Sequence, residues 1–229
     1  RTDCGETDLI LVDLGHGWCR LGGSALAQVY GNLGNETPDI DEPEALKVFF
    51  GVAQQLNREG KVLAYHDRSD GGLFAAVCEM MFAGRCGLML DVTPAAGSRD
   101  ALAALFNEEL GAVLQVRRPD TPGVLETFAG RGMGAQCHMI GEVNAGDMLN
   151  IAFSGQEIFR DTRVNLHRAW SETTCHMQKL RDNPECAQQE HDRLLDLDDP
   201  GLHAKLGFDP ADDVAVPYFN RGARPRMAV

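Results

Sequence analysis

Residues 65–73 bring together two carboxylates, a hydroxyl and two glycines, a set of groups that could bind a phosphate with its metal ion. The carboxylates are Asp67 and Asp70, and the hydroxyl is that of Ser69. The apolar run 62–64 before them predicts a buried strand. A stripe with helical spacing follows, formed by Leu73, Phe74, Val77, Met80 and Met81. Where a strand leads into a helix, backbone N–H groups and the helix dipole favour phosphate, and carboxylates can hold its magnesium.

The same residues could instead form a plain capping turn. Ser69 or Asp70 would then be the N-cap of the helix, and the glycines Gly71 and Gly72 would allow a tight backbone. Both interpretations fit the spacing, so the spacing alone leaves the choice open.

A second glycine-rich turn, Gly22-Gly23-Ser24, precedes a predicted helix that ends at Gly34. One face of that helix would carry Leu26, Val29, Tyr30 and Leu33. The turn could cradle an anion, or Ser24 could cap the helix after a flexible turn. It is not a G-x-G-x-x-G motif, so a Rossmann dinucleotide site has little support.

Three further side chains could take part in acid–base or metal chemistry. Glu108 and Glu109 follow Asn107 and could bind a metal or a ligand amine, although exposed acids at an element boundary are the simpler expectation. His66 precedes Asp67 and could be a general base. Because successive strand residues face opposite sides, His66 could equally be a satisfied core histidine.

The seven cysteines form neither a disulfide framework nor a metal-binding pattern. Their odd number, scattered positions and lack of a C-x-x-C pair indicate reduced thiols in a cytosolic protein. Cys137-His138 and Cys175-His176 are adjacent pairs without ligand spacing, so structural zinc is not expected. No G-x-S-x-G elbow is present, so a Ser-His-Asp hydrolase lacks support.

The composition is typical of a soluble globular protein. The chain has 229 residues, of which 44% are hydrophobic and 24% charged, enough for one good-sized core or one domain with an extension. The net charge of −13 argues against nucleic acid as a partner, because a duplex-binding protein needs a basic face. No apolar run approaches the roughly 20 residues that span a bilayer. With no signal peptide, we expect a cytoplasmic protein that does not bind a membrane.

Apolar patterns predict strands alternating with helices. The predicted strands are 9–12, 62–66, 87–92, 112–116 and 138–143, followed by a hairpin at 148–153 and 157–160. The predicted helices are 24–33, 46–56, 71–83, 102–105 and 123–129. This alternation predicts an α/β or α+β domain over about 5–160, with a mixed sheet packed with helices.

The chain after this domain has a different character. Leu166, Trp170, Thr173, Met177 and Leu180 predict a long helix. Residues 182–226 carry few apolar anchors, and the stretch 182–213 holds ten acidic residues against two basic ones, so we expect a solvated, mostly irregular connector. The chain lacks a starting Met, and residues 224–229 stop where an apolar strand would begin, so we expect a fragment of a longer polypeptide.

The segment Leu63–Leu73 resembles the second-half signature of the large phosphoribosylformylglycinamidine synthase family, the single-chain purine-biosynthetic enzymes of proteobacteria and eukaryotes. Five further segments support the resemblance in the same order along the chain: Leu21–Tyr30, Phe106–Val113, Trp170–Thr174, Arg181–Ala187 and Gly222–Val229. The resemblance therefore covers essentially the whole chain.

The resemblance implies both a fold and an activity. Residues 1–165 would be an aminoimidazole ribonucleotide synthetase C-terminal-like subdomain, in the second of two synthetase-like halves. Residues 166–229 would be a helix and an acidic connector leading to a glutaminase domain. The family is a ligase that makes formylglycinamidine ribonucleotide from formylglycinamide ribonucleotide, glutamine and ATP. Its first half carries the active site, and its second half holds a non-turning-over ADP with magnesium.

By this resemblance Asp67 is a magnesium ligand and Ser69 contacts the nucleotide, so the implied cofactors are Mg²⁺ and ATP or ADP. The remaining metal ligands would come from upstream synthetase subdomains, and the glutaminase Cys, His and Glu from a downstream domain. No catalytic residue is then expected in this chain, and the isolated chain would be inactive. The role of Gly22-Gly23-Ser24 stays open.

Two other functions remain to be weighed against this one. The chain could be a catalytic half of another enzyme of the superfamily, such as a selenophosphate or aminoimidazole ribonucleotide synthetase. It could also be a scaffold domain without a ligand. The connector favours the ligase part over a separate synthetase, and the acidic, glycine-bearing turn at 67–72 favours it over a scaffold.

Overall fold

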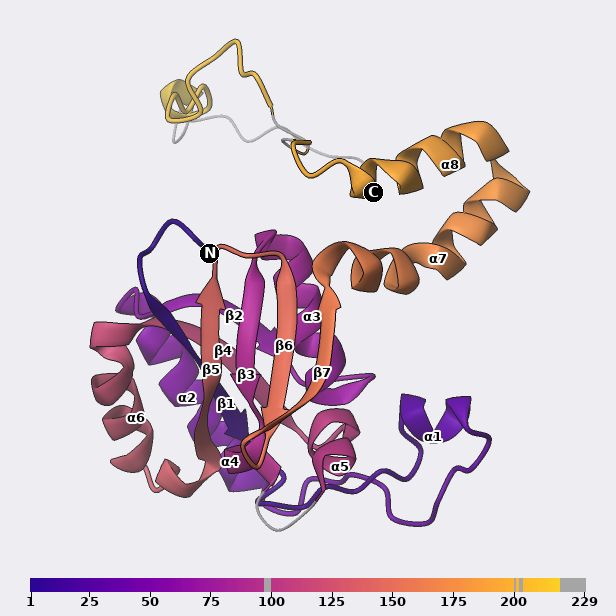
Figure 1. Cartoon of the computed structure of the whole chain (residues 1–229). Coiled ribbons are helices and arrows are strands. Elements are labelled where there is room, and N and C mark those ends of the chain that lie inside the picture. Colours follow the sequence, from indigo (N-terminus) through magenta and orange to yellow (C-terminus); the bar gives the residue numbers. More distant parts are fainter. Residues whose placement is uncertain (97–99, 200, 202–203, 219–229) are drawn as a thin grey trace, which may run out of the picture. The chain divides into compact units, whose positions relative to one another are not determined.

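The computed structural model describes residues 1–96, 100–199, 201 and 204–218 (Figure 1). The contacts divide the chain into two units, Arg1–Leu194 and Leu195–Val229, each of which stands by itself. The first unit contains the sheet and every α-helix of the described residues. The predicted strand at the C-terminal end, with the motif Gly222–Val229, lies outside the described residues.

The first unit is built on a sheet of seven described strands in the order β2-β4-β1-β5-β3-β6-β7. Their bounds are β1 (Thr7–Asp13), β2 (Val62–Asp67), β3 (Gly87–Asp91), β4 (Gly111–Arg117), β5 (Cys137–Asn144), β6 (Met148–Phe153) and β7 (Gln156–Thr162). Neighbouring strands are antiparallel except β3 and β6, which run parallel. Strands β6 and β7 form the hairpin that the sequence predicts.

Helices stand between the strands along the chain. The α-helices are α1 (Ala25–Val29), α2 (Pro43–Arg58), α3 (Gly72–Gly84), α4 (Thr93–Ala96), α5 (Ala101–Phe106), α6 (Thr121–Ala129), α7 (Arg163–Arg181) and α8 (Pro184–Asp192). Short 3-10 turns are η1 (Arg118–Asp120), η2 (Gly134–Gln136), η3 (Arg193–Leu195) and η4 (Val216–Tyr218).

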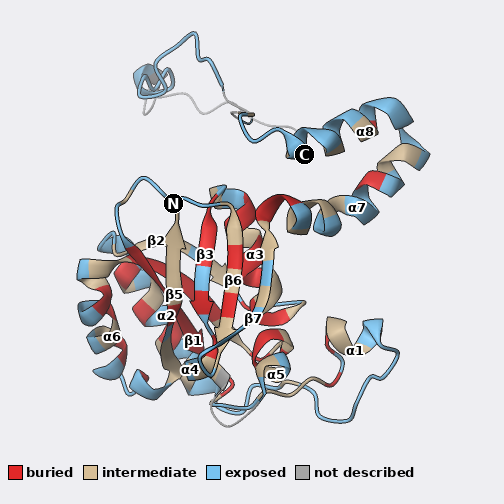
Figure 2. Ribbon diagram, in the orientation of Figure 1, coloured by how far each residue is buried: buried red, intermediate tan, exposed pale blue. Residues whose placement is uncertain are grey.

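The core consists of two apolar clusters, one on each face of the sheet (Figure 2). Helices α3 and α5 contribute to the first, which includes Leu73, Val77, Met81 and Leu105. Helices α2 and α6 contribute to the second, which includes Phe49, Val52, Leu56, Val124 and Phe128. Strand β1 supplies Leu9 and Leu11 to the first cluster and Ile10 and Val12 to the second. It is therefore buried on both faces, as its continuous apolar run predicts.

This arrangement confirms the predicted fold class, a mixed sheet packed with helices. Strands near the predicted positions alternate with helices along the first unit, and alternation of this kind produces a layered α/β structure. None of the helices in the described residues is both long enough and apolar enough to cross a membrane.

Strand β2 departs from its prediction as a buried strand. It is the first strand in the sheet order, and among the described strands its one partner is β4. Val62, Leu63 and Ala64 are half-buried, and Tyr65 is exposed. The apolar run predicted a buried strand because continuous hydrophobicity is typical of strands in the middle of a sheet. The position of a strand in the sheet, however, depends on pairing with segments far away in the sequence.

The helix predicted over 24–33 is also different. Helix α1 spans only Ala25–Val29 and buries none of its residues. Val29, Tyr30 and Leu33, predicted to share its packed face, are exposed. The helical spacing is present, but within the described residues no element covers this stripe.

The start of the predicted irregular connector is helical. Asn183 caps α8 by accepting the backbone N–H groups of Glu185 and Cys186, and α8 packs against α7 through Ala187 and Cys175. The Asn-Pro start and first-turn Glu are ordinary helix-start signals. The predicted domain boundary between residues 165 and 166 stays a prediction, and the division into two compact units falls after Leu194.

Candidate functional site

The turn between β2 and α3 is formed by two left-handed glycines. Gly71 is the N-cap of α3 with φ +81°, and Gly72 follows with φ +67°. A Cβ atom on Gly72 would lie 2.6 Å from the carbonyl oxygen of Asn107. Glycine is required there by both φ and space. The N-cap is thus neither Ser69 nor Asp70, and the Ser69 carbonyl accepts the Gly72 N–H at 2.9 Å.

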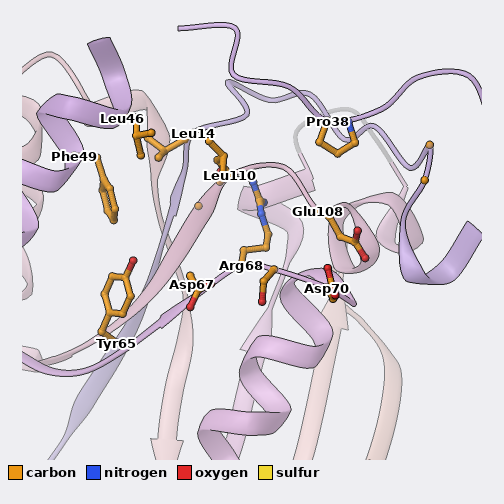
Figure 3. Close-up of a pocket in the computed structure, with 14 residues that line it drawn as sticks. Leu14, Pro38, Leu46, Phe49, Tyr65, Asp67, Arg68, Asp70, Glu108 and Leu110 are labelled. Atoms are coloured by element: carbon orange, nitrogen blue, oxygen red, sulfur yellow. Dashed lines mark hydrogen bonds between the residues drawn. The ribbon is translucent and has the colours of Figure 1, made fainter. Parts of the chain in front are cut away.

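With neither side chain used as a cap, the turn exposes polar groups to a pocket. This pocket has a volume of about 480 Å³, and its polar lining includes Asp67, Ser69 and Asp70 (Figure 3). The Asp67 side chain is 67% exposed, so its carboxylate is accessible to a ligand. The structure therefore brings both predicted site residues, Asp67 and Ser69, to one pocket.

The other end of the pocket is apolar. It is lined by Leu14, Leu46, Phe49 and Tyr65, which come from the β1 end, α2 and β2 (Figure 3). Partial burial, and then the nearby Asp67 carboxylate, raises the pKa of the Tyr65 phenol. Tyr65 therefore presents a neutral hydroxyl at neutral pH. The pocket thus combines an apolar surface with a carboxylate- and hydroxyl-bearing surface.

Arg68 fixes the position of the turn. Its side chain is 3% exposed, and Nη2 donates to Oδ1 of Asp13 at 2.5 Å and to the Leu110 carbonyl at 2.9 Å. Its Nε donates to the carbonyl of Glu109 at 2.6 Å. Through these hydrogen bonds, the planar guanidinium connects the end of β2 to the end of β1 and to the start of β4. The sequence analysis missed Arg68, although it lies between the two predicted site residues.

Glu108 and Glu109 are not the exposed acids that the sequence favoured. Glu109 is fully buried, and its two carboxylate oxygens accept Nε and Nη2 of Arg20 at 2.6 and 2.8 Å. Glu108 is half-buried and lines the pocket, with Oε1 accepting backbone N–H groups of Gly71 and Ala25. Burial is tolerated because each carboxylate finds donors, and the donors lie far away in sequence.

The Gly22-Gly23-Ser24 turn contributes backbone to the pocket and a cap to α1. Gly22 and Gly23 line the pocket, and Ser24 Oγ accepts the Ala27 N–H at 3.2 Å. A Cβ on Gly22 would lie 2.4 Å from the Glu36 carbonyl oxygen. The capping interpretation of Ser24 is therefore the observed one.

His66 is not among the residues that line this pocket. Its Nε2 lies 2.9 Å from Oε2 of Glu79 on α3, and its Nδ1 lies 2.7 Å from the Asp67 carbonyl oxygen. Both ring nitrogens therefore have partners, which agrees with a satisfied histidine and gives no geometry for a general base at the pocket.

Metal-binding groups are sparse. The described residues contain no group of three or more His, Cys, Asp or Glu side chains that could hold a metal ion. Asp67 offers a hard anionic oxygen of the kind magnesium prefers, but a complete coordination shell would need ligands besides those described.

The comparisons with known proteins agree with the fold. The family described as AIR synthase related protein, C-terminal domain, matches residues 9–153, more than half of the chain. Thermotoga maritima PurL complexed with ATP is similar with a TM-score of 0.57 and 14% identity, over 72% of this chain and 26% of that chain.

Two other solved structures give the same result. T. maritima PurL complexed with FGAR has a TM-score of 0.56 and 14% identity, over 70% of this chain and 27% of that one. Phosphoribosylformylglycinamidine synthase II from T. maritima has a TM-score of 0.56 and 13% identity, over 72% and 26%. At these identities the likeness shows the fold alone, and the chain spans about a quarter of the length of these structures.

The matched range 9–153 runs from β1 to β6 and contains the turn, the pocket and both core clusters. The chain therefore belongs to the AIR synthase related protein family, of which it carries the C-terminal domain.

Proposed function

We propose that this chain is part of a glutamine-dependent ligase that converts formylglycinamide ribonucleotide to formylglycinamidine ribonucleotide in purine biosynthesis. Within it, the pocket at the β2–α3 turn is one wall of a structural Mg–ADP site. The observation that carries the proposal is the placement of Asp67 and Ser69 at that pocket. The sequence resemblance, the family membership and the similarity to PurL structures complexed with ATP and with FGAR support it.

The charges around the pocket favour a nucleotide that arrives with a cation. Asp67, Asp70 and Glu108 line it, and Arg68, the one cation among the described lining residues, is paired with Asp13. A bare polyphosphate would face uncompensated carboxylates. A divalent ion between phosphate and carboxylate removes that repulsion, which supports magnesium as the partner of Asp67.

We assign the roles as follows. Asp67 supplies one oxygen to the metal, and the Ser69 hydroxyl donates to the nucleotide. Bound magnesium would neutralise the phosphates. The remaining metal ligands come from upstream synthetase subdomains, and ammonia comes from a downstream glutaminase domain of the same cytoplasmic enzyme.

The site is proposed as structural because the family resemblance places turnover in the first synthetase-like half, whereas this chain resembles the second. Burial raises the pKa of the thiols of Cys78 and Cys137 to about 12, so both are protonated at neutral pH. None of the residues that line the pocket is a cysteine. We accordingly assign no catalytic residue to this chain.

The proposal is tested by Mg–ADP binding to the intact enzyme that carries Asp67→Asn. An amide supplies only a neutral oxygen, so we expect ADP affinity to fall by about tenfold or more, and the nucleotide-dependent gain in melting temperature to shrink. Ser69→Ala removes one hydroxyl contact and no charge, so its effect should be smaller. Asp182→Asn, an exposed change at the end of α7, is the matched control and should have no effect.

An Asp67→Asn enzyme that keeps stoichiometric ADP and its full melting temperature would contradict the metal assignment. If it keeps ADP yet loses all turnover, the pocket belongs to the chemistry, and the chain would be a catalytic half of a related ATP-dependent synthetase.

A further inference from the structure

Two adjacent glutamates follow helix α5, and their side chains reach different partners. Glu109 binds Arg20, whose Nη2 also donates to Oδ2 of Asp41 at 2.7 Å. Glu108 forms no ion pair with a described residue, and the hydrogen bonds that it accepts from described residues come from backbone N–H groups. The two residues therefore do different things, although they are neighbours in sequence.

The Glu108 carboxylate joins two separate segments of the pocket. The backbone N–H groups of Gly71 and Ala25 both donate to Oε1, each at 2.8 Å. Gly71 belongs to the turn that carries Ser69, and Ala25 follows the glycine turn that also lines the pocket. One oxygen thus connects two chain segments, because the amides of Ala25 and Gly71 are 46 positions apart in the sequence.

The backbone that presents Glu108 is itself fixed. Asn107 is buried, and its Nδ2 donates to the carbonyls of Ala103 and Ala104 at the end of α5, at 2.7 and 3.2 Å. Its Oδ1 accepts the Glu109 N–H at 3.3 Å. Gly72 packs closely against the same backbone, because a Cβ atom on it would lie 2.6 Å from the Asn107 carbonyl oxygen and 2.7 Å from that of Leu105. Glu108 therefore extends from a rigid support toward the pocket.

We propose that Glu108 is a positioning residue, whose carboxylate oxygen sets the distance between the 69–71 turn and the 23–25 turn. This distance in turn determines the affinity of the pocket for nucleotide. This role rests on the proposed Mg–ADP site. Without Glu108, two amide groups lose their acceptor and the turn that carries Ser69 loses its tie to the facing loop. The positioning role needs an acceptor oxygen at this place rather than a negative charge, because both contacts of Glu108 are hydrogen bonds from uncharged backbone N–H groups.

The test compares Glu108→Ala with Glu108→Gln in the intact enzyme. Glutamine keeps an oxygen with two lone pairs at the same place, whereas alanine removes it. We expect Glu108→Ala to weaken Mg–ADP binding by about tenfold and Glu108→Gln to stay within about threefold of the wild type. Glu126→Ala, an exposed change on α6, is the control and should bind like the wild type.

Amide hydrogen exchange supplies the second readout, because it does not depend on nucleotide. In Glu108→Ala the amides of Gly71 and Ala25 should exchange faster, while those of β4 stay protected, and Glu108→Gln should restore both. If Glu108→Ala does not fold, Glu108→Asp replaces it, since a side chain one methylene shorter cannot reach both donors and should show the same loss.

The outcomes separate the two proposals. Glu108→Ala that binds Mg–ADP like the wild type, with unchanged exchange at Gly71 and Ala25, overturns the positioning role alone. An equal loss in Glu108→Ala and Glu108→Gln also overturns it, because charge would then be what matters. A wild-type enzyme that does not bind Mg–ADP overturns the proposed function, and with it the role of Glu108 in nucleotide affinity.

Discussion

Arg68 and Asp13 form the buried ion pair that anchors the proposed site, and both side chains are nearly inaccessible. Removing the arginine leaves a buried carboxylate and two carbonyls without their charged donor. We expect Arg68→Ala to lower the free energy of unfolding by about 3–5 kcal/mol, measured by urea denaturation. Arg68→Lys should recover little of this, because an ammonium group cannot reproduce the planar fork.

The control for this prediction is Arg131→Ala, an exposed change after α6, for which we expect a loss below about 0.5 kcal/mol. Equal stability losses in the two variants would mean that the Arg68 network contributes no more than a surface side chain.

The buried thiol of Cys78 makes the fold sensitive to alkali. Burial, and then the nearby Glu79 carboxylate, raises its pKa from 9.0 to about 12. The unfolded chain loses this proton first, so the contribution to stability is complete below about pH 9 and is lost as the pH rises toward 12. We expect the urea midpoint to fall as the pH rises from about 9 toward 12, and to fall less in Cys78→Ala. An identical pH dependence in the two proteins would show that Cys78 does not contribute.

At the scale of elements, helix α7 contacts α3 through a side-chain hydrogen bond and a neighbouring pair of stacked rings. Trp170 Nε1 donates to Oε1 of Glu79 at 2.9 Å, and the other oxygen of Glu79 faces His66. Beside it the His167 ring stacks on Phe82, with centroids 4.4 Å apart. Burial lowers the pKa of His167, so the ring that stacks is neutral. The contact joins β2, α3 and α7.

Trp170→Phe keeps an aromatic ring but removes the donor. Because the indole is 59% exposed, we expect a modest loss of about 1 kcal/mol in the free energy of unfolding. In a double-mutant cycle, Trp170→Phe and Glu79→Gln should be coupled by a similar amount. Strictly additive losses would show that the hydrogen bond makes no net contribution.

At the scale of the whole molecule, the two units differ in how well they are packed. The described residues 204–217 of the second unit are all exposed, among them Phe208 and Val214, whereas the first unit contains both core clusters. Acidic residues in this stretch also repel one another. We expect trypsin to cut after Lys205 before it cuts after Lys61 or Arg85, as followed by mass spectrometry of early fragments.

Helix α8 limits the part of the connector in which early cleavage is expected. Its packing on α7 should protect residues 184–192, which the sequence had placed in the irregular connector. Early cleavage within 62–84 would instead show that the first unit is the less stable one.

The sequence by itself determined what depends on near neighbours. Apolar runs and helical stripes located β1, α2, α3 and the β6–β7 hairpin, because period 2 and period 3.6 are local properties. The same local reasoning placed Asp67 and Ser69 between a strand and a helix, where the pocket is found. Membership of the AIR synthase related family followed as well, because the motifs on which the resemblance rests are short and continuous.

Only the tertiary structure decided what depends on partners far along the chain. The edge position of β2, the solvent exposure of α1 and the burial of Glu109 could not be inferred locally, because sheet order and ion pairing join distant segments. Glu109 is paired with Arg20, 89 positions away. A carboxylate is exposed by default and is buried only where the fold supplies donors, and that supply is a property of the three-dimensional arrangement.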